Sequence, residues 1–195
     1  MPPHTANPSA RQTELLEAAY RYALAHGLAD LSLRPLAEAI GSSTRVLMFL
    51  FGNKDGLVRA LLERARVDEL AVLVQLRQED NPVGLATAAE RVWTWIAADE
   101  HRPLLRLWAE AYTRSLVEPE GPWAGFAGAT VEDWLNVLAA CQPEPHRDTE
   151  AASVRRTAAL AVLRGALLDL LATDDEPRVT AAVHYQLELL RSDEN

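Results

Sequence analysis

The sequence predicts an all-α protein with a small amino-terminal domain and a larger helical domain after it. Its 195 residues are enough for one small domain and one with a sizeable core. Hydrophobic residues make up 49% of the chain and only 9 residues are glycine, a composition typical of a globular, helix-rich protein. Apolar residues recur at helical spacing between breaks rich in proline or glycine, and strand signals are scarce. Every element below is therefore predicted to be a helix.

The first helix is predicted over residues 10–26, where apolar residues recur on one face. These residues are Leu15, Leu16, Ala19 and Ala23. We expect this face to brace the two short helices that follow.

Two short helices around a glycine turn are predicted between residues 32 and 51. Ser32 can accept the first unpaired N–H groups of one helix, and Ser43 can do the same for a second helix over residues 44–51. Gly41 supplies the turn between them. This arrangement is the helix-turn-helix pattern of DNA-binding proteins.

The segment resembles the DNA-binding domain of the TetR family of transcriptional regulators. The residues that carry the resemblance are Leu15, Leu16, Ala19, Gly27, Leu36, Ala37, Gly41, Phe51, Lys54 and Leu57. The resemblance implies a DNA-binding domain at residues 9–69, with its helix-turn-helix core at 32–51, and a helical ligand-binding and dimerisation domain at 70–195. It also implies a homodimeric transcriptional regulator, a repressor that a small hydrophobic ligand releases from double-stranded operator DNA.

Five polar residues are candidates for contact with DNA. Arg45 and Thr44 are expected to reach base edges, because their side chains carry hydrogen-bond donors. Phosphate contacts are expected from Arg34, Ser43 and Lys54. Lys54 is placed at a predicted helix amino terminus, where the N–H groups and the helix dipole already attract phosphate.

Residues 46–51 are apolar on every side of the predicted helix, which is rare for a short surface helix. We expect about half of this run to be buried and the rest exposed. Val46 and Phe49 are candidates for apolar contact with thymine methyl groups in the major groove. Family members usually carry tyrosine or histidine near this point, but Met48, Phe49 and Leu50 cannot hydrogen-bond phosphate. The alternative is a helical ligand-binding or protein-interaction module with a degenerate DNA-reading head.

The formal net charge of -9 argues by itself against a nucleic-acid partner. The charge is unevenly distributed, however. Residues 1–66 hold 8 Lys or Arg against 6 Asp or Glu, whereas the remainder holds 11 against 22. Because residues 1–66 are weakly basic and the remainder is acidic, electrostatic attraction orients residues 1–66 toward DNA.

A long helix over residues 54–78, capped by Asn53, is predicted to link the two domains. Proline-containing segments then divide the second domain into five more helices. These are predicted at residues 82–98, 102–117, 123–140, 149–173 and 177–191.

All five tryptophans lie between residues 93 and 134, outside the predicted DNA-binding domain. Ordinary core packing is one interpretation of this cluster. The family resemblance implies the other interpretation, a cavity for a small hydrophobic ligand. The candidate ligand-binding residues are Trp93, Trp95, Trp108, Tyr112, Trp123, Phe126 and Trp134.

Nearby acidic residues are expected to lie mostly on a solvated face. One of them inside the cavity would favour a cationic or amine ligand, and the sequence leaves open which one. The acids considered are Asp99, Glu100, Glu110, Glu132 and Asp133.

Two apolar stripes indicate that the last two helices form an association surface. One stripe consists of Leu160, Leu163, Leu167 and Leu171, and the other of Val179, Val183, Leu187 and Leu190. In TetR-like proteins the corresponding helices pair across a twofold axis as a four-helix bundle, so the resemblance implies a homodimer. The alternative is that both stripes belong to a core within one chain.

The sequence lacks common signatures of enzymes, so we expect no enzymatic activity, no cofactor and no metal. Its five histidines are scattered without metal-ligand spacing. Cys141 is expected to be a small buried residue and not a redox sensor. Arg164 and Asp169 interrupt the longest apolar stretch, and the chain begins without an apolar run. We therefore expect no membrane segment and a cytoplasmic location.

Overall fold

Helices account for all the regular structure in the part of the chain that the computed structural model describes, which is residues 10–28, 30–77, 83–144 and 146–192. No strand occurs in these residues, and the all-α prediction is confirmed. The elements are α1 (Ala10–His26), α2 (Leu33–Ala39), α3 (Thr44–Phe51), α4 (Lys54–Arg77), α5 (Leu85–Ala97), η1 (Asp99–His101), α6 (Arg102–Val117), α7 (Phe126–Ala140), η2 (His146–Asp148), α8 (Glu150–Thr173) and α9 (Glu176–Ser192).

Local capping explains where the helices of the helix-turn-helix segment begin. The Ser43 hydroxyl accepts a hydrogen bond from the Val46 N–H at 3.3 Å, and the Asn53 side chain accepts one from the Gly56 N–H at 2.7 Å. Gly41 has a φ of +64°, in the left-handed region that glycine adopts at little cost. The expected cap at Ser32 is wrong, because its side chain makes no capping hydrogen bond to α2.

Two helices begin three residues later than the sequence predicts. Helix α7 begins at Phe126 rather than at residue 123, because Gly125 adopts a left-handed conformation with φ +75° and cannot belong to a right-handed helix. Helix α5 begins at Leu85 rather than at residue 82, which lies outside the described residues. The predicted domain boundary at residues 69 and 70 falls inside α4, which continues without a break from Lys54 to Arg77.

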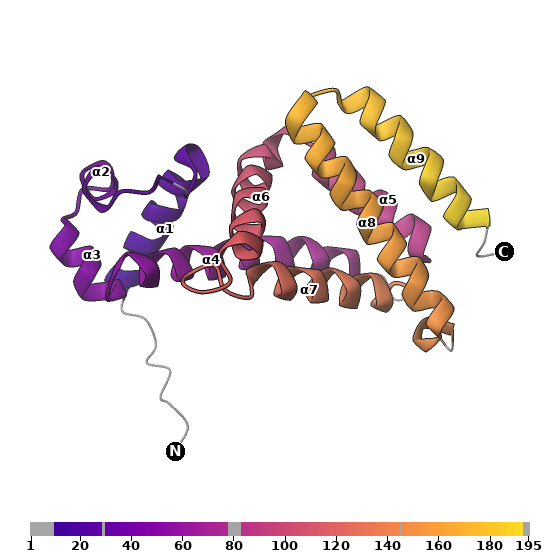
Figure 1. Ribbon diagram of the computed structural model, residues 1–195, viewed down its shortest axis with the longest axis horizontal. Helices are drawn as coiled ribbons and strands as arrows, with labels where there is room; N and C mark the ends of the chain where they lie inside the picture. Colours follow the sequence, from indigo (N-terminus) through magenta and orange to yellow (C-terminus); the bar gives the residue numbers. More distant parts are fainter. Residues whose placement is uncertain (1–9, 29, 78–82, 145, 193–195) are drawn as a thin grey trace, which may run out of the picture.

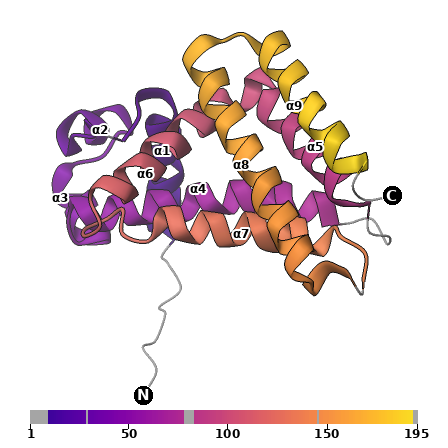
Figure 2. The same ribbon diagram turned by 45° about the vertical axis from the view of Figure 1, so that its right-hand side comes forward.

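Helix α4 joins the two ends of the molecule (Figure 1). Helices α1 and α3 pack against its amino-terminal half, α2 packs against α1 and α3, and α7 lies alongside α4, as both views show (Figure 2). Helix α6 crosses α4 near its middle and contacts α1, α7 and α8 as well. Helices α5, α8 and α9 pack against one another at the end opposite α1 to α3.

The buried apolar residues form two cores. One is built from α1 to α4 with the inner faces of α6 and the start of α7, and the other from α5, α7, α8 and α9. Trp108 of α6 packs against both cores. Helix α6 therefore connects the two cores.

Candidate DNA-reading helix and ligand cavity

Helix α3 is anchored by one side and presents the other to solvent. Leu47 is only 1% exposed, whereas Phe49 is 86% exposed. Val46 and Met48 are also exposed, while Leu50 is half-buried. The expectation that about half of the apolar run would be exposed is confirmed.

The polar candidates of the helix-turn-helix segment all lie on the surface. Thr44 and Arg45 are exposed at the start of α3, beside the exposed Ser43. Lys54 is exposed in the first turn of α4. Arg34 of α2 is exposed and pairs with Glu38 at 3.3 Å, an ion pair in solvent that is weak enough to yield to a phosphate.

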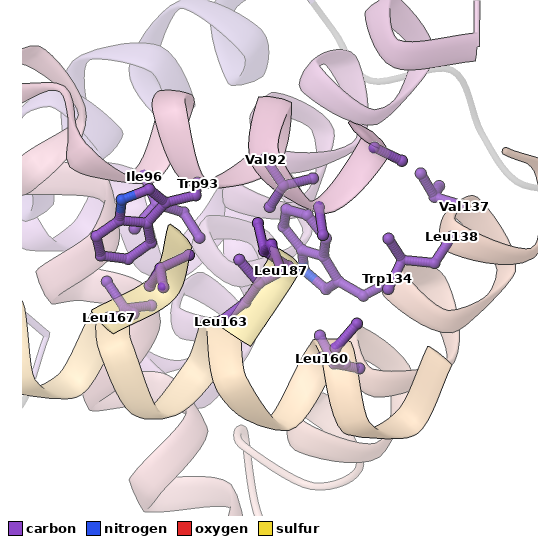
Figure 3. Close-up of a cluster of buried hydrophobic side chains, with 14 of the residues drawn as sticks. Val92, Trp93, Ile96, Trp134, Val137, Leu138, Leu160, Leu163, Leu167 and Leu187 are labelled. Carbon is purple, nitrogen blue, oxygen red and sulfur yellow. The ribbon is translucent and has the colours of Figure 1, made fainter. Parts of the chain in front are cut away.

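A cavity of about 40 Å³ lies between α4, α5, α6, α7 and α8. Apart from Glu69 and Arg164, its walls are apolar or aromatic side chains. Figure 3 shows the indole of Trp134 between Val92 of α5 and Leu160 of α8, both of which line the cavity. The lining residues are Ala65, Glu69, Val92, Trp95, Ile96, Leu104, Leu105, Trp108, Phe126, Trp134, Leu160, Leu163, Arg164 and Leu167.

The structure brings four of the seven candidate aromatic residues to this cavity, namely Trp95, Trp108, Phe126 and Trp134. The other three do not line it, and for them the ligand-binding expectation needs correction. Trp93 points toward α9, where its indole N–H donates to the Thr180 hydroxyl at 2.9 Å. Trp123 is buried in the core around α1 to α4.

Tyr112 lies behind the cavity wall rather than in it. Its ring stacks on Trp108 with the ring centres 4.8 Å apart, and its hydroxyl accepts a hydrogen bond from Arg164 at 2.7 Å. Tyr112 therefore supports two residues that do line the cavity.

Glu69 is the acidic residue in the cavity, and the sequence interpretation missed it. It is 6% exposed, and its carboxylate accepts a hydrogen bond from the Trp134 indole N–H. Burial raises the pKa of Glu69 to about 7, although the bond from Trp134 acts in the opposite direction. Glu69 continues the inward series of Leu62 and Ala65 at helical spacing, and this spacing was the signal that could have found it.

None of the five acids considered from sequence lines the cavity. Asp99, Glu100 and Glu132 are exposed, and Asp133 pairs with Arg66 outside the cavity. Glu110 instead accepts a hydrogen bond from the Leu28 N–H at 2.9 Å.

The predicted dimerisation stripes face the interior of a single chain, which corrects the expectation that they form an association surface. Six of the eight stripe residues are buried, because α5 and α7 cover the inner faces of α8 and α9. These are Leu160, Leu163, Leu167, Val179, Val183 and Leu187, while Leu171 and Leu190 are half-buried in the same core.

The outer face of α8 carries a second apolar series. Exposed residues follow one another at alternating steps of four and three along the helix, the spacing of a packing seam. They are Val154, Ala158, Ala161, Gly165, Leu168 and Ala172, and α9 adds the exposed Ala182, Tyr185 and Leu189.

Among the described residues, no group of three or more His, Cys, Asp or Glu side chains is arranged to hold a metal ion. None of the described helices is long and apolar enough to cross a membrane. Cys141 is buried.

Comparison with known proteins finds a family model for the amino-terminal domain and solved structures with the same fold. The family model described as "Bacterial regulatory proteins, tetR family" matches residues 15–61. No curated protein matches the sequence. Among solved structures, a TetR-family transcriptional regulator from Cytophaga hutchinsonii is similar with a TM-score of 0.74 and 17% identity, covering 95% of this chain and 97% of that chain.

Two further structures are similar over nearly the whole chain. A TetR transcription regulator from Haloarcula marismortui has a TM-score of 0.73 and 18% identity, covering 91% of this chain and 94% of that one. The multidrug binding protein EbrR, complexed with proflavin, has a TM-score of 0.61 and 25% identity, covering 91% of this chain and 99% of that one. The helix-turn-helix domain thus matches the tetR family of bacterial regulatory proteins over residues 15–61, and the whole chain shares the fold of solved TetR-family transcriptional regulators.

Proposed function

We propose that the protein is a homodimeric transcriptional repressor that a small hydrophobic ligand releases from its operator. The observation that carries this proposal is the position of α6. One side of this helix lines the cavity through Trp108, and another contacts the DNA-reading domain through Glu110. The proposed activity is binding and not catalysis.

In this proposal α3 enters the major groove. Arg45 and Thr44 reach base edges, and Arg34, Ser43 and Lys54 hold phosphates on either side. All five side chains are exposed, and none is held by a buried partner. The exposed Val46 and Phe49 add contacts with thymine methyl groups.

The dimer in this proposal uses the outer faces of α8 and α9, since the stripes predicted from sequence are already covered within the chain. The series from Val154 to Ala172 includes small residues that allow close approach of a second α8, and Leu168 and Tyr185 supply apolar area. Packing of these faces across a twofold axis gives a four-helix bundle. Two copies of α3 would then meet the two halves of a palindrome.

The cavity is nearly filled by side chains in this state. A space of about 40 Å³ holds a few water molecules but not an aromatic ligand, so binding requires the helices around it to separate. A ligand that binds only the more open arrangement shifts the protein toward it. The similarity to the multidrug binding protein EbrR, which was solved with proflavin, supports an aromatic ligand.

Separation of the walls would act on the DNA-reading domain through α6. Trp108 forms part of the wall, and Glu110 lies about half a turn further along the same helix. The Glu110 carboxylate is bonded to Leu28 in the link between α1 and α2. Movement of α6 therefore changes the position of the helices that carry α3.

A second candidate function is ligand or protein binding by a helical module without useful DNA affinity. The apolar end of α3, with Met48, Phe49 and Leu50, favours it because these residues cannot bond phosphate. A mobility-shift assay on DNA upstream of the protein's own gene separates the two functions. A protein–DNA complex that persists in an excess of random-sequence competitor DNA supports the repressor.

The ligand part of the proposal has its own experiment. Hydrophobic compounds are titrated into the protein and into Trp108→Ala, with intrinsic tryptophan fluorescence as the measurement. The best compound should weaken operator binding roughly 5- to 150-fold, the usual range of coupling in regulators. A compound that quenches fluorescence without changing operator affinity would show that the cavity is not a sensor.

A further inference from the structure

We propose that the cavity selects hydrophobic ligands that carry a positive charge, with the Glu69 carboxylate as their counter-ion. The proposal rests on the ligand-binding part of the proposed function and names the chemical class of the ligand. It stands on the placement of one acidic side chain, at the contact of α4, α6 and α7, in a cavity whose other lining residues are apolar or aromatic except for Arg164 of α8.

The Glu69 carboxylate has unused hydrogen-bonding capacity. A carboxylate can accept about four hydrogen bonds. Among the described residues, the Trp134 indole N–H donates to Glu69, and the Trp108 indole is close enough to lower the Glu69 pKa by the same kind of interaction. Ala65 precedes it by one turn, and the neighbouring walls contribute Leu105, Trp108 and Phe126. Two indole donors leave part of the accepting capacity of this carboxylate free for a molecule in the cavity.

No described cation forms an ion pair with Glu69. Arg66, on the same helix, pairs with Asp133 of α7. Arg164 of α8 lines the cavity, and its guanidinium donates to the Tyr112 hydroxyl at 2.7 Å. The parts of α5 and α6 that line the cavity carry no charged side chain.

Leaving an ionised carboxylate unpaired in such a place is unfavourable, which is why burial raises the pKa of Glu69 to about 7. Asp133 raises this pKa further, whereas the bond from Trp134 and the charge of Arg66 lower it. The nearby Trp108 indole also lowers the pKa. A ligand cation beside Glu69 would restore the ionised form and supply the missing partner.

The aromatic walls suit the same class of ligand. The faces of tryptophan rings attract cations, most strongly where water is excluded. Trp95, Trp108 and Trp134 all line the cavity, and they come from three different helices. A flat or compact aromatic cation would thus meet ring faces on its apolar surface and a carboxylate at its charge.

The test compares two probes of the same shape, 1-methylquinolinium and 1-methylnaphthalene, which differ in one ring atom and in charge. Both require the same opening of the cavity, so the cost of opening cancels in the comparison. Their dissociation constants are measured by equilibrium dialysis at about pH 8 for the wild type, Glu69→Gln and Glu63→Gln. Glu63 is an exposed carboxylate on the same helix and serves as the matched control.

We expect Glu69→Gln to weaken 1-methylquinolinium binding about 10- to 100-fold and to change 1-methylnaphthalene binding less than about twofold. Glu63→Gln should leave both constants unchanged. If Glu69→Gln weakens both probes equally, or neither, Glu69 is not a counter-ion and the proposal is overturned.

A second measurement needs no variant. Because 1-methylquinolinium does not titrate, its affinity for the wild type should rise up to about 10-fold from about pH 6 to about pH 8, as Glu69 ionises. A flat profile overturns the proposal.

If 1-methylnaphthalene binds the wild type and 1-methylquinolinium does not, the cation preference is wrong while ligand binding stands. If neither probe binds, the ligand part of the proposed function fails, and this inference fails with it.

Discussion

The carboxylate of Glu110 accepts a hydrogen bond from the backbone N–H of Leu28 at 2.9 Å and thereby ties α6 to the link between α1 and α2. The same oxygen lies 3.1 Å from the position that a Cβ atom would take at Gly27. Space at this junction is therefore tight, and the junction connects the helix that carries Trp108 of the cavity wall to the DNA-reading domain.

Removing this bond should weaken the effect of the ligand on DNA. Glu110→Ala leaves the Leu28 N–H without its partner and should cost about 1–3 kcal/mol of unfolding free energy. It should also reduce the ratio of operator affinities measured without and with ligand. Thr113→Ala, an exposed change on the same helix, is the control. A variant that is destabilised but keeps the full ratio would show that coupling takes another route.

Arg45 and Lys54 should differ in what their loss does to DNA binding. Arg45→Ala should cost about 1–3 kcal/mol and relax sequence preference at one position of each half-site. Lys54→Ala should weaken binding to all sequences alike and reduce the salt slope by roughly one unit for each phosphate that is no longer neutralised. Mobility shifts over a range of salt concentrations distinguish the two effects. Wild-type behaviour in both variants would contradict both assignments.

Phe49 should read a thymine methyl group. Its side chain is 86% exposed, so Phe49→Ala should change the unfolding free energy by less than about 0.5 kcal/mol. In an operator selected from random DNA, replacing one thymine by uracil should cost the wild type about 0.8 kcal/mol, the worth of one buried methyl group. The Phe49→Ala variant should not respond to that replacement. Equal responses in both proteins would remove Phe49 from the interface.

Leu167 and Leu168 should respond in opposite ways to the same substitution. Leu168 is 53% exposed on the outer face of α8, so Leu168→Arg should give a folded monomer at micromolar concentration. Leu167 is 4% exposed, and Leu167→Arg should prevent folding because it buries an unpaired charge. Sedimentation and circular dichroism report the two outcomes. A Leu168→Arg protein that is still a dimer would place the interface elsewhere.

Glu69 should make stability depend on pH. Because burial raises its pKa from 4.5 to about 7, the folded protein holds this proton more tightly than the unfolded chain. The stabilisation is complete below about pH 4.5 and is lost as the pH rises through 7. Relative to the wild type, Glu69→Gln should therefore gain about 3 kcal/mol of unfolding free energy across this range. Urea titrations at several pH values measure the unfolding free energies of both proteins. A difference between them that does not change with pH would exclude a raised pKa for Glu69.

Helix positions could be predicted from the sequence because they depend on neighbouring residues. Ser43 and Asn53 cap the helices that follow them, and Gly41 makes the turn, as expected. The predicted limits of α1 and α6 agree with the structure at both ends. These signals act within a few residues of the chain, so no tertiary information is needed to interpret them.

Which apolar face a helix buries was decided only by the tertiary structure. Helix α8 is apolar on two sides, and periodicity alone could not show that α5 and α7 cover the side of Leu167 and leave that of Leu168 exposed. The same holds for Trp93 and Trp134, which lie on different helices and face different neighbours. The role of Glu69 likewise depends on distant parts of the chain, such as Trp134, that surround it with apolar walls. Burial is a property of packing between distant segments, and a single sequence specifies the apolar face but not the element that covers it.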